Sequence, residues 1–147
     1  MKLVDVNLLL YAIDEDSPRH EAAKGWLEEQ LSGSETLALG WAVLVAFLRL
    51  ATNPRVFVDP LRLEDALDLV DAWLALPNVT VVHPTRRHAA LLRELLLPLG
   101  TAGNLSTDAH LAALSIEHGA ELCSADRDFA RFPRVRWLDP LESAATS

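Results

Sequence analysis

Four aspartates stand at positions where the pattern of apolar residues ends a strand or begins a helix. Asp5 closes the first apolar run, and Asp126 and Asp128 follow a later one. Asp108 opens a predicted helix. Carboxylate oxygens are the ligands that Mg²⁺ and Mn²⁺ prefer, and a bound divalent cation relieves the repulsion between neighbouring carboxylates. The residue types therefore point to a hard-cation site, provided that the fold brings them together.

Each of these aspartates also has a local structural explanation. The helix dipole favours a carboxylate in the first turn of a helix, so Asp108 needs no ligand there, and Thr107 is predicted to cap that helix. Asp126 and Asp128 suit a turn after a strand. Asp5 is harder to explain in this way, because an acid within a buried strand requires a partner or a metal. Spacing alone leaves structural and metal-binding roles open.

The elements that must position these residues alternate along the chain. Strands are predicted at 2–6, 35–39, 79–82, 120–123 and 135–138, and helices at 18–31, 41–51, 63–76, 85–97, 108–118 and 126–131. Residues 8–13 are predicted to start a helix or form a turn. Strands joined by helices of crossover length imply an α/β fold, a three-layer α/β/α sandwich with a central, mostly parallel sheet. Ligands bind such sheets outside the carboxyl ends of the strands, where distant aspartates can converge.

Length and composition fit a single folded domain. The chain has 147 residues, of which 50% are hydrophobic and 23% charged, and its formal net charge is −8. We expect one domain over 1–140 and a short C-terminal tail over 141–147. Apolar runs fall far short of the roughly 18 residues that a membrane span needs. No basic-then-apolar leader opens the chain, so we expect a cytoplasmic protein without a membrane partner.

Other chemistries lack their sequence signatures. The single cysteine, Cys123, excludes an internal disulfide and a Cys-rich zinc site. The chain contains neither the phosphate-binding pattern GxxxxGK[ST] nor the acyl-transfer pattern GxSxG. The absence of lysine after Lys24 argues against an aspartyl-phosphate enzyme. The five histidines show no HExxH pattern, and we expect them on the surface or on helix faces.

Five short segments, taken together, resemble PIN-domain ribonucleases, and more closely the VapC toxins of toxin–antitoxin pairs. They are VDVN at 4–7, FLR at 47–49, TNPR at 52–55, GNLSTDAHLA at 103–112 and SADRDF at 124–129. The similarity runs in order from residue 3 to about residue 138. It implies a PIN domain over 1–140 that acts as an Mg²⁺-dependent endoribonuclease, with Mn²⁺ as an alternative ion, and leaves a 5′-phosphate and a 3′-hydroxyl.

The resemblance also assigns roles to individual residues. The family's catalytic and metal-binding acids correspond to Asp5, Asp108 and Asp126, with Asp128 as a neighbouring candidate ligand. Two polar residues that order the family's site correspond to Asn7 and Thr107. Arginine suits bidentate contacts to phosphate, and the candidate RNA contacts are Arg49, Arg55 and Arg127.

The resemblance further implies an RNA substrate, a VapB-type antitoxin, toxin homodimers and toxin–antitoxin hetero-oligomers. One departure concerns the central helix, where PIN nucleases commonly carry a glutamate and this chain has Ala46. Some VapC relatives also lack that glutamate. The departure leaves open whether one or two metals bind. It also motivates an alternative hypothesis, a catalytically weakened PIN-like module that binds RNA or a protein partner.

Overall fold

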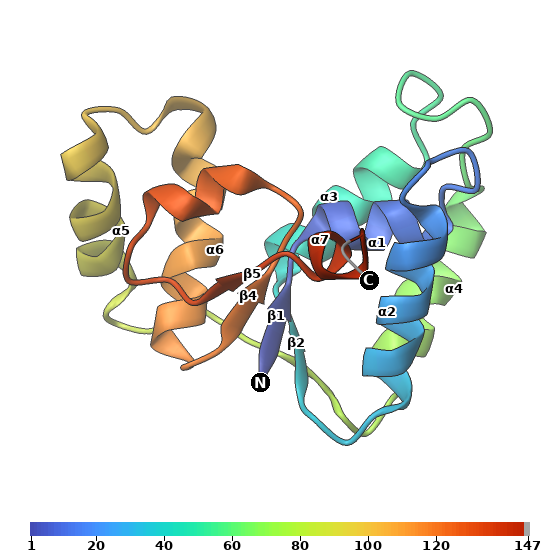
Figure 1. The fold of residues 1–147 in the computed structure, drawn as a ribbon, viewed down its shortest axis with the longest axis horizontal. Coiled ribbons are helices and arrows are strands. Elements are labelled where there is room, and N and C mark those ends of the chain that lie inside the picture. The colour runs from blue at the N-terminus through green and yellow to red at the C-terminus, as the bar shows by residue number, and fades with distance from the viewer. Residues whose placement is uncertain (146–147) are drawn as a thin grey trace.

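A five-stranded parallel sheet forms the centre of the protein (Figure 1). The computed structural model describes the backbone of residues 1–145 and the side chains of residues 1–142. The strands are β1 (Lys2–Val4), β2 (Leu37–Leu39), β3 (Val79–Val81), β4 (Glu121–Cys123) and β5 (Trp137–Leu138). Their order across the sheet is β3-β2-β1-β4-β5, and every neighbouring pair is parallel.

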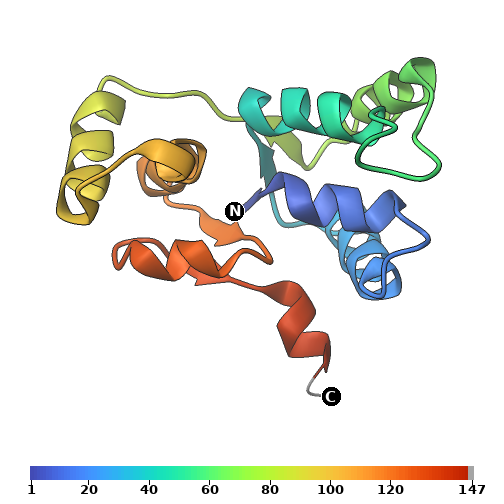
Figure 2. The same cartoon turned by 90° about the horizontal axis from the view of Figure 1, so that it is seen from above.

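Helices cover both faces of this sheet, which confirms the predicted three-layer α/β/α sandwich. One face carries α1 (Val6–Ile13), α2 (His20–Ser32), α3 (Trp41–Ala51) and α4 (Leu63–Leu74). The other carries α5 (His88–Leu96) and α6 (Ser106–Glu117), as Figures 1 and 2 show. From β1 to β3 the chain proceeds toward one edge of the sheet, and from β3 it crosses back past β1 to β4. Because both kinds of connection are right-handed, their helices lie on opposite faces of the sheet.

Short elements complete the chain. They are the 3₁₀ segments η1 (Leu97–Leu99), η2 (Gly103–Leu105) and η3 (Arg127–Arg131), and the C-terminal helix α7 (Pro140–Ala145). A short tail was predicted over 141–147. In the structure, α7 occupies this segment up to residue 145, and residues 146–147 lie outside the described residues. No helix in the described part of the chain has the length and apolar character that a bilayer span requires.

The sheet reverses its winding direction between β1 and β4, and this position defines the ligand crevice of an open α/β fold. β1 and β4 are directly paired, with Val4 opposite Cys123. The backbone N–H of Asp5 continues the ladder and donates to the Cys123 carbonyl at 2.9 Å. The residues after both strands, Asp5 and Ser124, therefore leave the sheet side by side.

Two local predictions were wrong. Asp5 does not lie inside a strand: β1 ends at Val4, and Asp5 is the N-cap of α1, where its Oδ1 accepts from the Val6 N–H at 2.7 Å. Thr107 does not cap α6, because the turn of η2 runs directly into that helix and moves its start to Ser106. Gly119 follows the C-cap of α6 and has a φ of 62°, the left-handed conformation that often ends a helix.

Candidate metal centre

Asp5 is a largely buried carboxylate held by three donors at the end of β1. Its Oδ1 accepts from Val6 N–H, and its Oδ2 accepts from Ser124 Oγ at 2.7 Å and from Asn7 Nδ2 at 3.3 Å. Burial raises the pKa of Asp5, the hydrogen bonds from Ser124 and Val6 oppose this shift, and the nearby charge of Asp126 adds to it. The carboxylate is therefore fixed in position and sensitive to the charge around it.

Ser124 connects the two strand ends and was not among the predicted site residues. Its side chain is fully buried, and its Oγ donates to Asp5 while it accepts from the Asp126 N–H at 3.0 Å and from Asn7 Nδ2 at 3.0 Å. Asn7 Oδ1 in turn accepts from the Ala125 N–H at 3.2 Å. The signal in the sequence that could have identified Ser124 is a hydroxyl residue between a buried strand and an acidic turn. These bonds fix the loop after β4 against the start of α1.

Three carboxylates gather beside Asp5. Asp108, Asp126 and Asp128 each place an oxygen within 4.8 Å of the others, and all three side chains are half-buried. Asp108 is the third residue of α6, and Asp126 is the N-cap of η3, where it accepts from the Asp128 N–H at 2.9 Å. The start of one helix and the turn after β4 thus supply the whole group.

The electrostatics of this group favour a cation. Burial raises the pKa of Asp108 to about 6, and the charges of Asp126, Asp5 and Asp128 contribute to that shift. Among the described side chains, one cation forms an ion pair with the group: Arg131 Nε lies 3.6 Å from Asp128 Oδ1. Three clustered carboxylates with so little compensation fit a hard divalent cation such as Mg²⁺ or Mn²⁺, which takes oxygen ligands.

The predicted acids therefore divide into two sets. Asp108, Asp126 and Asp128 form the group that can share one ion, whereas the two oxygens of Asp5 are engaged by protein donors next to it. Asp5 is still close enough to raise the pKa of Asp108. Cys123 is no ligand candidate, because burial raises the pKa of its thiol to about 12.

The remaining predicted residues are not members of the three-carboxylate group. Thr107 is exposed in the first turn of α6, Arg49 is exposed on α3, and Arg55 is exposed in the loop between α3 and α4. Arg127 pairs with Glu142 of α7 at 2.7 Å. Ala46 is half-buried on α3 and offers no oxygen in its side chain. The site-ordering and RNA-binding roles of these residues stay predictions.

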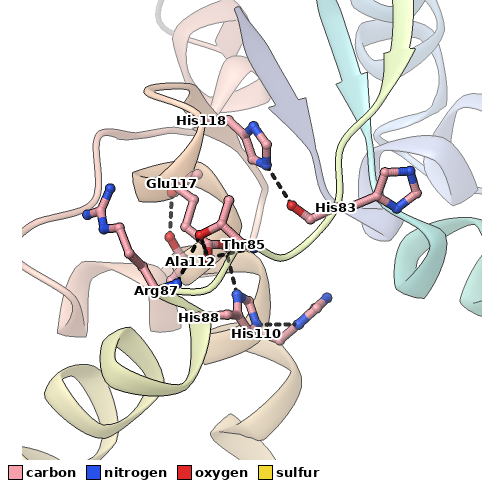
Figure 3. Close-up of polar contacts among 9 residues, drawn as sticks. His83, Thr85, Arg87, His88, His110, Ala112, Glu117 and His118 are labelled. Atoms are coloured by element: carbon pink, nitrogen blue, oxygen red, sulfur yellow. Dashed lines mark hydrogen bonds and ion pairs between the residues drawn. The ribbon is translucent and has the colours of Figure 1, made fainter.

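A partly buried polar network joins α6, which carries Asp108, to α5 (Figure 3). Glu117 has a fully enclosed side chain; its Oε1 accepts from Thr85 N–H at 3.0 Å and from Thr85 Oγ1 at 2.6 Å. Its Oε2 lies 2.8 Å from His88 Nδ1, and His88 Nε2 lies 2.9 Å from His110 Nδ1. His88 and His110 lie on helix faces, as predicted, and are half-buried between α5 and α6.

We expect Asp108→Asn to stabilise the metal-free protein at pH 7. A raised carboxyl pKa means that the folded state resists ionisation, so the wild type loses stability as pH rises from 3.8 to about 6. After allowance for partial solvent screening, Asp108→Asn should raise the free energy of unfolding at pH 7 by about 1–2 kcal/mol. This difference from the wild type should disappear below pH 4. Urea unfolding in EDTA across this pH range measures it.

Asp65→Asn is the matched control, because Asp65 is likewise the third residue of its helix, α4, but is exposed. It should slightly lower stability by removing a favourable interaction with the helix dipole. Adding Mg²⁺ should stabilise the wild type more than Asp108→Asn, because the ion binds the folded state. Equal stability of Asp108→Asn and the wild type at pH 7 would contradict the repulsion inferred here.

Comparisons with known proteins agree on one family. Residues 2–135 match the family model described as PIN domain. The chain is 47% identical over 140 residues to Ribonuclease VapC37 of Mycobacterium tuberculosis, covering 95% of this chain and 97% of the relative. It is 43% identical over 141 residues to Ribonuclease VapC33 of the same organism, covering 96% and 99%.

Solved structures share the fold at lower sequence identity. VapC20 of Mycobacterium tuberculosis, described as a sarcin–ricin loop cleaving toxin, aligns with a TM-score of 0.67 and 20% identity over 92% of this chain and 98% of that chain. VapBC2 from Rickettsia felis, bound to a DNA fragment from its promoter, aligns with a TM-score of 0.66 and 19% identity over 93% and 96%.

Proposed function

Because the chain belongs to the PIN domain family and, within it, to the VapC ribonucleases, we propose that it is an Mg²⁺-dependent endoribonuclease and the toxin of a toxin–antitoxin pair. The observation that carries this proposal is the meeting of Asp108, Asp126 and Asp128 beside Asp5 where the sheet reverses its winding. Side chains remote in the sequence thereby form one anionic site with little internal compensation.

The chain's own residues perform two tasks in this reaction. Asp108, Asp126 and Asp128 would hold the ion, and Ser124 and Asn7 hold Asp5 next to them. Mg²⁺, when bound, supplies positive charge to the phosphate and lowers the pKa of a bound water. Water then attacks the phosphorus in line, the bond from phosphorus to the 3′-oxygen breaks, and that oxygen takes a proton. The products are a 5′-phosphate and a 3′-hydroxyl.

Substrate and partners follow from the same family membership. Arg49 and Arg55 are exposed and contact the RNA backbone, as does Arg127 next to the acidic site. The partners are a VapB-type antitoxin and a second copy of the chain, which assemble into a hetero-oligomer in the cytoplasm. Mn²⁺ substitutes for Mg²⁺, since both ions take carboxylate and water ligands.

Cleavage of RNA by the purified protein tests this function. We expect cleavage with Mg²⁺ or Mn²⁺ and none in EDTA, with ends that carry a 5′-phosphate. Asp5→Asn should abolish Mg²⁺-dependent cleavage while the fold persists, because an asparagine oxygen can still cap α1. Gel analysis of labelled RNA and circular dichroism measure the two effects.

The outcome separates the enzyme from the alternative binding module. RNA binding without cleavage under any divalent ion would favour the module, which the missing carboxylate at Ala46 motivates. Unchanged cleavage by Asp5→Asn would remove Asp5 from the site.

A further inference from the structure

A cavity is lined in part by the loop after β4, which also supplies Asp126 and Asp128 of the acidic centre. It has a volume of about 480 Å³ and is bounded by the start of α2, the loop after β4 and helix α7. Ala125 lines it, and the next residue, Asp126, belongs to the three-carboxylate group. Helix α7 packs against α2 and buries Leu141, which closes one wall. The cavity is therefore adjacent to the place where a scissile phosphate would be held.

Two arginines from different elements face this cavity. Arg19 precedes α2, and its guanidinium carbon lies 5.6 Å from the centre of the Tyr11 ring, which orients the side chain. Arg127 begins η3, and its Nη2 lies 2.7 Å from Glu142 Oε1. Arginine presents a planar set of donors that matches phosphate oxygens.

The two acids that line the cavity differ in their roles. Asp139 accepts from the backbone N–H groups of Leu141 at 3.0 Å and Glu142 at 3.4 Å, so its carboxylate caps α7. Glu142 lies in the first turn of α7, and its carboxylate pairs with Arg127. The positive charges of Arg19 and Arg127 cancel the negative charges of Asp139 and Glu142. If the Glu142 carboxylate moves away, the groups that remain carry a net charge of about +1.

We propose that this cavity is a subsite for an RNA backbone phosphate next to the scissile one, and that Glu142 competes with that phosphate for Arg127. The inference rests on the proposed function. A phosphodiester chain presents further phosphates beside the one that reacts, and a protein of net charge −8 needs local cations to bind them. The Arg127–Glu142 pair is 79% and 53% exposed, so exchanging the carboxylate for a phosphate loses little.

RNA binding by the full chain tests the subsite. We measure the Kd of a fluorescent single-stranded RNA in Ca²⁺ by anisotropy, at several salt concentrations. Arg19→Gln and Arg127→Gln should each weaken binding about 5–10-fold and lower the salt slope by about 0.7. Glu142→Gln should tighten binding about threefold. Glu142→Gln should tighten binding less in the Arg127→Gln background than in the wild type, because Glu142 acts mainly through that arginine.

A second exposed ion pair provides the control. Arg134 and Glu94 are 2.6 Å apart and 47% and 52% exposed, so they resemble the Arg127–Glu142 pair in distance and in the exposure of the glutamate. Arg134→Gln and Glu94→Gln should leave the Kd unchanged. Circular dichroism and Tm verify that each variant folds.

The outcomes separate the two proposals. If the wild type cleaves RNA but the arginine variants bind it normally, the subsite is overturned and the proposed function stands. Unchanged or weaker binding by Glu142→Gln overturns the competition. A wild type that neither binds nor cleaves RNA overturns both the function and the subsite.

Discussion

Asp108→Asn is expected to lower kcat/KM for Mg²⁺-dependent RNA cleavage by at least two to three orders of magnitude. Asp108 is the member of the three-carboxylate group contributed by α6, and the other two members come from the turn after β4. An amide in its place keeps the shape but removes a negative charge from the ion's ligands. Loss of one preorganised electrostatic contact at a reacting phosphate has an effect of about this size.

Single-turnover cleavage at saturating protein measures this loss across a series of Mg²⁺ concentrations. Asp65→Asn, which changes the corresponding position of α4, should cleave like the wild type. Recovery of part of the activity at high Mg²⁺ would show that Asp108 acts mainly in ion affinity. A rate within tenfold of the wild type at every Mg²⁺ concentration would exclude Asp108 from the centre.

Glu117→Ala is expected to destabilise the protein by about 2–4 kcal/mol. The substitution removes the acceptor of three hydrogen bonds, from Thr85 N–H, Thr85 Oγ1 and His88 Nδ1. Thr85 is exposed and can bond to water instead, whereas His88 is half-buried and loses its partner. Removing one partner of a buried polar pair carries the desolvation penalty of the groups that remain. For a domain of this size the Tm should fall by about 4–16 °C, as calorimetry can measure.

The pH dependence provides a second readout for Glu117. Burial opposes its ionisation, but the hydrogen bonds from Thr85 and His88 outweigh burial and hold the pKa of Glu117 below its usual value of 4.5. A lowered carboxyl pKa contributes stability above pH 4.5 that disappears as pH falls through the folded-state pKa. The difference between the wild type and Glu117→Ala should therefore shrink in acid.

Glu94→Ala on the neighbouring helix α5 is the control for this prediction. Glu94 also has a basic partner, Arg134, but the pair is exposed and contributes at most about 1 kcal/mol. Equal Tm losses for Glu117→Ala and Glu94→Ala would contradict the structural role of the partly buried network. Because α6 carries Asp108, loosening of the α5–α6 contact should also weaken Mg²⁺ binding.

The amino-acid sequence by itself determined the positions of the strands and of most helices, although helix α7 lies where a tail was predicted. Each predicted strand contains one strand of the sheet, and the predicted parallel sandwich is confirmed. Apolar periodicity and turn residues act within a few positions of one another, so they can be interpreted without knowing the fold. The segments at 4–7, 103–112 and 124–129 contain the acids and Ser124 that meet at the sheet edge.

Only the tertiary structure decided how those side chains divide their roles. Both oxygens of Asp5 accept hydrogen bonds from protein donors, and Asp128 lies with Asp108 and Asp126. Glu117 pairs with His88. These contacts join residues far apart in the chain, and their distances depend on strand register and on the residue at which α6 begins. A shift of one residue in either would turn a carboxylate away from the site, and no local pattern encodes that geometry.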